Sequence, residues 1–295
     1  MNNIFLGTVK LSNSDYGFSR FRSNSKFNSN IFLKNVELLG INKFDTSPRY
    51  GDSEKILGNY FKLSKTKPVV SSKIDCLYAN DSKSKITMIE SVRKSLDNLY
   101  LDNLDICYLH QNDINIISDH YVHEGIDELK SLGLINAVGS SIYSLEEYEY
   151  SINSGIFDYV QIPINVIDLS FYKYLINKKS KIKIVARSIL LQGVLANKES
   201  YFSKVIGANK LQSRFDLIDS LAADNKMSRL EFAISTVLSL GLIHSFIIGS
   251  TSISHIKEII NLSNQSVSDE SFRLLLKMNS KSHSMTNPKN WNFIK

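Results

Sequence analysis

Four side chains suited to proton transfer lie at or just after short apolar segments of this sequence. Asp45 ends one such segment, and Tyr50 follows it by five residues. Lys73 and His110 end the next two segments. A carbonyl group that accepts a hydride becomes an alkoxide-like oxygen, which needs a proton or a neutralising charge as it forms. These residue types therefore indicate acid–base chemistry at a carbonyl group.

The proton donor in this set is predicted to be Tyr50. A phenol has an unperturbed pKa near 10 and gives up its proton reluctantly at neutral pH. An ammonium about 4 Å away favours the phenolate by roughly 4 kcal/mol at an effective dielectric of about 20, or about three pKa units. We expect Lys73 to supply this charge and Asp45 to pair with Lys73, which keeps the ammonium ionised in a partly desolvated pocket. His110 is expected to hydrogen-bond the substrate oxygen.

These residues can meet if the segments that carry them are neighbouring parallel strands. Short apolar segments alternate with amphipathic ones along the whole chain, which is typical of βαβ units. Eight strands are predicted, at residues 3–8, 43–46, 68–73, 104–109, 135–139, 158–162, 182–186 and 245–248. Eight strands close a barrel, and about 250 residues suffice for one. The chain is therefore predicted to be one α/β domain over residues 1–295, a (β/α)8 TIM barrel; an open doubly wound sheet is the alternative.

Three helices can be predicted from spacing and from capping residues. In residues 84–98 apolar side chains recur every three or four positions. This spacing predicts one buried stripe, made of Ile86, Ile89, Val92, Leu96 and Leu99. Two further helices are predicted to begin with the Ser-x-x-Glu pattern of a capping box, at Ser144 and Glu147 and at Ser228 and Glu231.

Composition argues against several other classes of protein. The net charge of +6 is spread along the chain, so nucleic-acid binding is not expected, whereas small anions such as phosphorylated cofactors are favoured. Cys76 and Cys107 are predicted in buried strand or strand-end segments, without a disulfide framework or a zinc cluster. No signal peptide and no apolar stretch of 18 residues is found, so we expect a cytoplasmic protein with no membrane partner. Nothing in the sequence decides between a monomer and a small homo-oligomer.

A longer motif surrounds the first two of these polar residues. The string Asp-x4-Tyr-Gly-x-Ser-Glu-x-x-Leu-Gly occupies residues 45–58. With this string, the later strand-end Lys and His, and segments 6–8, 133–141 and 247–250, the chain resembles the aldo-keto reductase family over nearly its whole length. The resemblance implies an NAD(P)-dependent oxidoreductase that reduces an aldehyde or ketone. The implied catalytic residues are Asp45, Tyr50, Lys73 and His110.

The resemblance also suggests a substrate and leaves two other roles open. Loop segments 160–165 and 187–193 are similar to those of bacterial members of sugar or polysaccharide metabolism, which implies a small sugar-type carbonyl compound. One alternative is a cofactor-binding regulatory barrel subunit with little turnover, although all four polar residues are retained. The other is a barrel lyase or isomerase that uses Tyr50 and Lys73 for proton transfer. Consumption of nicotinamide during turnover discriminates among the three.

The family's nicotinamide site maps partly onto this sequence. A Ser-Asn pair after the fifth strand and a Gln on the sixth hold the carboxamide, and they correspond to Ser141, Ile142 and Gln161. Ile142 cannot make the hydrogen bonds of Asn. Ser141 and Gln161 still carry groups that can orient a carboxamide.

The end of the seventh strand departs from the family, because Arg187 stands where a Tyr commonly stacks on the nicotinamide. A guanidinium can stack on a flat ring, but a fixed positive charge beside an oxidised nicotinamide is unfavourable. Arg187 is therefore expected either to stack on the ring or to face a phosphate or an acidic substrate group. The family's pyrophosphate loop implies the further cofactor residues Ser188, Leu190, Gln192 and Gly193.

The last strand leads into a hydroxyl-rich loop at a helix N-terminus, which suits a phosphate. The cofactor residues implied there are Gly249, Ser250, Ser252, His255 and Glu258. NADP-type relatives often carry Lys and Arg at the positions of Gly249 and His255. Their absence here weakens the prediction that a 2′-phosphate is bound. We expect NADPH, with NADH as the alternative, and no metal. Family members use their C-terminal tails to shape the substrate pocket, and residues 280–295 either do so or pack under the barrel.

Overall fold

A computed structural model describes residues 3–12, 27–110, 113–176, 181–196, 205, 207–262, 266–279, 284–286 and 290–291. Its strands form a closed parallel barrel in chain order, in which β8 pairs with β1. The strands are β1 (Ile4–Gly7), β2 (Lys43–Asp45), β3 (Val69–Ile74), β4 (Ile106–Leu109), β5 (Val138–Ser141), β6 (Tyr159–Pro163), β7 (Lys183–Arg187) and β8 (Ser245–Ile248). The predicted (β/α)8 TIM-barrel fold is therefore confirmed.

One strand boundary differs by three residues from its prediction. The fifth strand was expected from residue 135, but β5 begins at Val138. Ile135 makes only an isolated bridge to Leu104, and the regular ladder with β4 starts when Val138 pairs with Cys107. The apolar segment therefore enters the sheet before it becomes a continuous strand.

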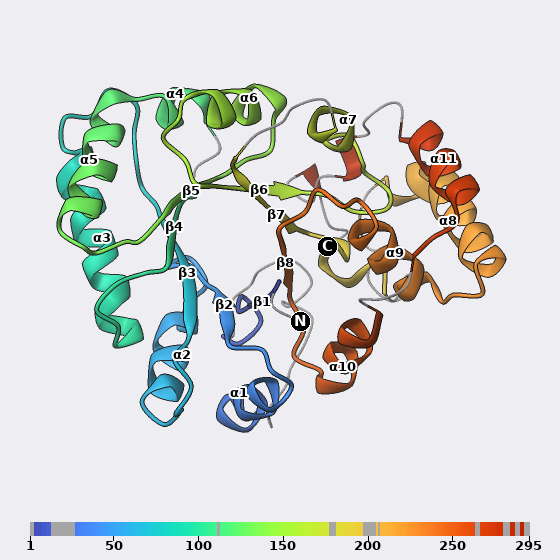
Figure 1. Cartoon of the computed structure of the whole chain (residues 1–295), viewed down its shortest axis with the longest axis horizontal. Coiled ribbons are helices and arrows are strands. Elements are labelled where there is room, and N and C mark those ends of the chain that lie inside the picture. Colours follow the sequence, from blue (N-terminus) through green and yellow to red (C-terminus); the bar gives the residue numbers. More distant parts are fainter. Residues whose placement is uncertain are drawn as a thin grey trace. The chain divides into compact units, whose positions relative to one another are not determined.

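Contacts divide the chain into two compact units, each described here by itself. The first unit, Met1–Ile162, Ser180–Val185 and His244–Ile253, holds nearly all of the strand residues. Its helices surround β1 to β6 in Figure 1. They are α1 (Ser29–Leu38), α2 (Ser53–Phe61), α3 (Ser84–Leu99), α4 (Ile114–Ile117), α5 (His120–Ser131) and α6 (Leu145–Asn153).

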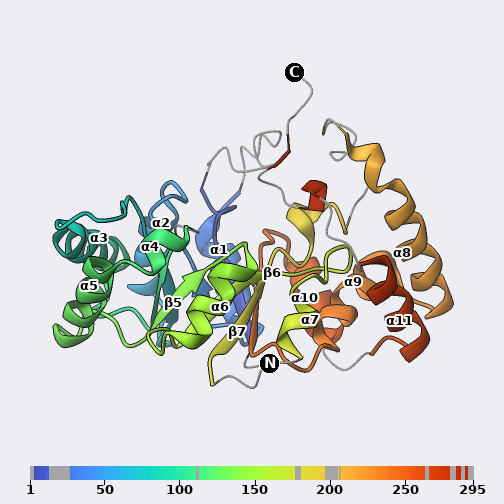
Figure 2. The ribbon, with the colours of Figure 1, turned by 90° about the horizontal axis from the view of Figure 1, so that it is seen from above.

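The second unit holds the helices that follow β6 and β7 and those at the end of the chain. They are α7 (Tyr172–Leu175), α8 (Gln212–Asp224), α9 (Arg229–Leu238), nearly all of α10 (Ile253–Asn261), and α11 (Asp269–Met278). Within this unit α8 and α11 lie side by side (Figures 1 and 2). A single domain over residues 1–295 stays a prediction.

Both predicted capping boxes are confirmed. Ser144 precedes α6, and its side chain accepts from the backbone N–H of Glu147, whose carboxylate accepts from the backbone N–H of Ser144. Ser228 and Glu231 form the same pair at the start of α9. Each box satisfies two backbone donors that a helix start otherwise leaves without partners.

The buried face of α3 was predicted partly wrongly. Val92, Leu96 and Leu99 are buried as expected, but Ile86 is 58% exposed and Met88 is fully buried in its place. A Cβ on Gly125 of α5 would overlap the sulfur of Met88, so the missing side chain at Gly125 makes room for Met88. Two residues span about 200° of a helix, so burying Met88 turns Ile86 outward.

A glycine of the 45–58 motif allows close packing of two helices. A Cβ on Gly58 of α2 would overlap the carbonyl oxygen of Asn98 and crowd Leu99 at the end of α3. We expect Gly58→Ala to lower the free energy of unfolding by about 1–3 kcal/mol, because backbone must move to admit the methyl group. Urea unfolding measures this loss. Asn59→Ala, at the exposed neighbour in the same helix, is the control, and equal stability of the two variants would contradict the packing argument.

The two cysteines differ in exposure. Cys107 is fully buried, as expected, and burial raises the pKa of its thiol to about 12, with a further contribution from Glu54. Cys76 is exposed, with a left-handed backbone at φ 61°, so its predicted burial is wrong. It lies just beyond the end of β3, where the chain has left the sheet. No helix among the residues that the structure describes has the length and apolar character needed to cross a membrane.

Candidate active site

The polar residues at the carboxyl ends of the strands converge inside the barrel. Side chains two residues apart on a strand share a face. Along β2 the inner face runs through Asp45 and reaches Ser47 just after the strand, and along β3 it passes Ser71 and Lys73. On β6 the same face carries Gln161, which hydrogen-bonds Asp45.

The Asp45 carboxylate is the centre of this cluster, and both of its oxygens are used. Lys73 Nζ donates to Oδ2 at 2.7 Å. Ser71 Oγ and Gln161 Nε2 donate to Oδ1 at 2.9 and 3.0 Å. Lys73 also donates to the backbone oxygen of Thr46 at 2.8 Å. Because Asp45 and Lys73 are both only 3% exposed, these contacts offset the cost of burying two charges and hold the ammonium in place.

Tyr50 lies beside this ammonium, half-buried in the loop between β2 and α2. Lys73 Nζ is 5.0 Å from the centroid of the Tyr50 ring. The ring of His110 meets the Tyr50 ring edge-on, with 6.2 Å between centroids. The loop itself is held by Ser12 Oγ, which donates to the Tyr50 carbonyl at 2.7 Å, and by an ion pair between Arg49 and Asp75. The structure thus brings together the four residues predicted to be catalytic, Asp45, Tyr50, Lys73 and His110, which we call the tetrad.

Ser47 links the loop to His110 and was not predicted from the sequence. Its Oγ accepts from the backbone N–H of Arg49 at 3.2 Å and lies 3.2 Å from His110 Nδ1. The tautomer of His110 decides which of the two donates, and the Ser47 hydroxyl is free to rotate its proton toward Nδ1. A neutral imidazole that accepts at Nδ1 carries its proton on Nε2. When the Ser47 hydroxyl donates, Nε2–H is left as the donor of His110.

We expect Ser47→Ala to lower turnover about fivefold, because a lost hydrogen bond of about 1 kcal/mol no longer fixes the His110 tautomer. The ring nitrogen chemical shifts of His110 should then report a mixture of tautomers. Thr46→Val is the matched control, since the buried Thr46 hydroxyl has no hydrogen-bond partner among the described residues. A single Nε2–H tautomer in Ser47→Ala would show that Ser47 does not select it.

Tyr108 fills part of the barrel interior near Asp45 and Gln161, and it was not predicted as a site residue from the sequence. Burial raises the pKa of its phenol well above the usual value, with smaller contributions from Asp45 and Tyr159, and it hydrogen-bonds Gln161. A Cβ on Gly139 of β5 would overlap the Tyr108 ring, so this glycine provides the space. The signal in the sequence was the two-residue spacing between Tyr108 and His110.

Ser53 and Glu54, the Ser-Glu pair of the 45–58 motif, form hydrogen bonds with residues outside the tetrad. Ser53 Oγ donates to the backbone oxygen of Thr8 at 2.8 Å. The buried Glu54 carboxylate accepts from Ser72 Oγ at 2.7 Å and from Asn98 Nδ2 at 3.2 Å. These contacts fix the start of α2, and so the end of the Tyr50 loop.

Ser141 and Gln161 form a buried pair that suits a carboxamide. Ser141 Oγ donates to Gln161 Oε1 at 3.3 Å, and Gln161 Nε2 is used by Asp45. The pair therefore presents oxygen lone pairs, which match the two N–H donors of a nicotinamide amide. Ile142 is fully buried, and its backbone N–H donates to the backbone carbonyl oxygen of Gln161 at 3.0 Å. Ser141 and Gln161 thus fit the carboxamide of a nicotinamide cofactor, because their oxygen atoms can accept its N–H groups.

The loop after β7 belongs to the second unit and has an unusual backbone. Ser188, Leu191, Gln192 and Gly193 all have positive φ, at 60°, 46°, 57° and 98°. Gln192 Oε1 is buried without a hydrogen-bond partner among the described residues. Left-handed residues other than Gly are uncommon and cluster at ligand-binding segments. This loop, which also contains Arg187 and Leu190, therefore has the strained backbone and the unused buried acceptor of a ligand-binding segment.

The loop after β8 joins the first unit to α10. Ser250 Oγ accepts from the backbone N–H of Ser252 at 3.1 Å, so the hydroxyl orders the turn before the helix. Gly249 and His255 are exposed, and Glu258 is half-buried. His255 and Glu258 lie in the second unit, and the tetrad lies in the first unit. Of the C-terminal tail, Trp291 is buried, while residues 280–283, 287–289 and 292–295 lie outside the described residues.

The family model described as "Aldo/keto reductase family" matches residues 3–280. The chain belongs to the aldo/keto reductase family. An uncharacterized oxidoreductase of Bacillus subtilis, YqkF, is 26% identical over 88% of this chain and 90% of its own. L-galactose dehydrogenase of Arabidopsis thaliana is 26% identical over 75% of this chain and 73% of its own. The family and these relatives indicate that this aldo/keto reductase is an oxidoreductase.

A solved structure supports the same fold. The glycerol dehydrogenase AKR11B4 of Gluconobacter oxydans superposes with a TM-score of 0.71 and 21% identity, covering 93% of this chain and 90% of that chain. Identity at this level shows a shared barrel only.

Proposed function

We propose that this aldo/keto reductase reduces an aldehyde or ketone to an alcohol, with Tyr50 as the proton donor. The observation that carries the proposal is the buried Lys73 ammonium, paired with Asp45 and 5.0 Å from the Tyr50 ring centroid. An ammonium beside a phenol favours release of the phenolic proton. Tyr50 itself is half-buried.

Each residue of the cluster has its own part in this proposal. Tyr50 gives its hydroxyl proton to the substrate oxygen, and the positive charge on Lys73 compensates the negative charge left on the phenol. Asp45 holds the Lys73 ammonium in place. His110 donates a hydrogen bond from Nε2 to the same substrate oxygen, which orients the carbonyl group for attack.

NADPH is the cofactor we propose, with NADH as the alternative; when bound, the reduced nicotinamide supplies the hydride. Ser141 and Gln161 are proposed to accept the N–H groups of its carboxamide. The loop after β7 and the loop after β8 are proposed to hold the phosphates, because they offer backbone N–H groups, hydroxyls and a helix N-terminus. Arg187 is proposed to stack on the ring or to face an anionic group.

The substrate we propose is a sugar-type or polyol-type carbonyl compound. Support comes from the printed names of relatives, L-galactose dehydrogenase and D-arabinose 1-dehydrogenase of Saccharomyces cerevisiae, the latter 25% identical over 55% of this chain. A cytoplasmic location and a monomer or small homo-oligomer stay predictions.

The test is a cofactor titration followed by a substrate panel. NADPH and NADH are titrated by fluorescence, and cofactor oxidation is then followed with aldoses, small aldehydes and ketones. We expect saturable binding of NADPH and oxidation with at least one sugar-type aldehyde. Binding without any oxidation would favour the regulatory subunit. Conversion of a substrate without cofactor consumption would favour the lyase or isomerase.

A further inference from the structure

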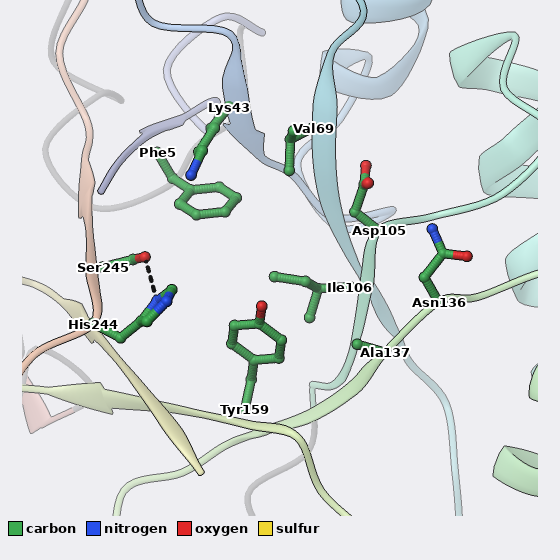
Figure 3. Close-up of a pocket in the computed structure, with 10 residues that line it drawn as sticks. All are labelled: Phe5, Lys43, Val69, Asp105, Ile106, Asn136, Ala137, Tyr159, His244 and Ser245. Atoms are coloured by element: carbon green, nitrogen blue, oxygen red, sulfur yellow. Dashed lines mark hydrogen bonds between the residues drawn. The ribbon is translucent and has the colours of Figure 1, made fainter. Parts of the chain in front are cut away.

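A second pocket lies at the amino-terminal mouth of the barrel, at the other end of the strands from Tyr50. Its volume is about 280 Å³. The side chains that line it include Phe5, Lys43, Val69, Ile106, Tyr159 and His244, which lie at or near the starts of their strands (Figure 3). All of them belong to the first unit. Barrel enzymes work at the opposite mouth, so the proposed reduction does not use this pocket.

Cationic and donor groups gather on one side of this pocket. Figure 3 shows the side chains of Lys43, His244 and Tyr159 pointing toward one another beside Phe5. Lys183 adds a second ammonium, which donates to the Tyr159 hydroxyl at 3.2 Å. Burial lowers the pKa of His244 below its usual value, and Lys183 and Lys43 lower it further, so both ammonium groups act on the same space.

The carboxylate that lines the pocket does not cancel this charge. Asp105 Oδ2 accepts from the backbone N–H of Val70 at 2.8 Å. In Figure 3 the Asp105 side chain lies beyond Ile106, away from Lys43 and His244. The side of the pocket near Lys43 therefore attracts anions.

Apolar side chains form part of the pocket lining. Phe5 is buried and forms a core cluster with Ile106 and Tyr108, against which Val69 and Tyr159 pack. The ring edge of Tyr159 meets the His244 ring at 6.1 Å between centroids. A cavity of about 150 Å³ accepts benzene, so about 280 Å³ accepts one ring with a charged group and water.

We propose that the amino-terminal mouth binds a small organic carboxylate with a flat apolar body. Its carboxylate lies between Lys43, His244 and Tyr159, and its body lies against Phe5 and Ile106. The cations alone would suit inorganic phosphate, but the apolar lining favours an anion that also buries carbon surface.

Benzoate is the probe, and benzamide is its neutral counterpart of nearly equal shape. The imidazole resonance of His244, assigned from its loss in His244→Gln, reports binding at this mouth and is independent of turnover. We expect saturable shifts of this resonance with a benzoate Kd of about 1 mM, a value typical of a small ligand. Benzamide should bind at least about tenfold more weakly. Phosphate should also bind more weakly than benzoate.

Lys43→Met should weaken benzoate binding at least about tenfold, because a charge-assisted hydrogen bond is lost. Lys94→Met, at an exposed position of α3, makes the same change in net charge and should leave the Kd within about twofold. Equal binding of benzoate and benzamide, equal binding in both lysine variants, or an unshifted His244 resonance would each overturn the proposal. Benzoate bound only at the Tyr50 mouth would produce the last of these results.

Discussion

Replacing Tyr50 with Phe is expected to lower turnover at least about 100-fold while leaving cofactor affinity unchanged. The ring would still fill its place beside Lys73 and His110, so only the proton donor is removed. Steady-state rates of carbonyl reduction and a fluorescence titration with NADPH measure the two quantities separately. The expected result is therefore a loss in kcat without a loss in binding.

Tyr100→Phe is the control for this experiment. Tyr100 is 55% exposed and lies at the C-terminal end of α3, where Lys62 packs over its ring. Its loss of a hydroxyl should leave turnover within about twofold, as expected of an exposed surface substitution. If Tyr50→Phe kept the turnover of Tyr100→Phe, Tyr50 would not be the proton donor.

Asp45→Asn is expected to have the largest combined effect on stability and activity. Asn has the shape of Asp but leaves the buried Lys73 ammonium without its counter-charge. Breaking one side of a buried ion pair costs about 3–5 kcal/mol of stability. Turnover should fall as well, because Lys73 is no longer held beside Tyr50. Urea unfolding and carbonyl reduction measure the two effects.

A double variant separates stability from chemistry. Asp45→Leu with Lys73→Met removes both charges and fills similar volume, so it should regain part of the stability lost in Asp45→Asn, the rest being lost because Ser71, Gln161 and the Thr46 carbonyl no longer have their partners. Activity should stay lost, because no ammonium remains near Tyr50. Asp45→Asn with unchanged stability would show that the ion pair is not needed to balance charge in the barrel. Recovered activity in the double variant would remove Lys73 from the proposed mechanism.

The sequence predicted the fold and the tetrad because both depend on short-range patterns. Apolar runs that end in Asp45, Lys73 and His110 set the strand ends, and opposite charges predicted the Asp45–Lys73 pair. The hydrogen bond between Ser47 and His110 depends on the path of a loop relative to a distant strand. Such a contact has no periodic signal, so it needed the structure.

The errors have a similar cause. The spacing of helix α3 is compatible with a buried stripe that contains Ile86 or with one that contains Met88. The choice depends on Gly125, a residue of another helix, because only its missing side chain admits Met88. Cys76 was predicted to be buried with the strand, yet the chain turns outward two residues after β3 ends. Tertiary packing decided both cases.

Strand β2 runs from one mouth of the barrel to the other, since Lys43 begins it and Ser47 follows its other end. Four residues of a strand span about 13 Å. Over that distance two unit charges interact by about 1.3 kcal/mol at an effective dielectric of about 20. A negative ligand bound at Lys43 would therefore disfavour the negative charge that develops at the far mouth during carbonyl reduction. The rate of reduction would fall roughly tenfold, without any movement of the backbone.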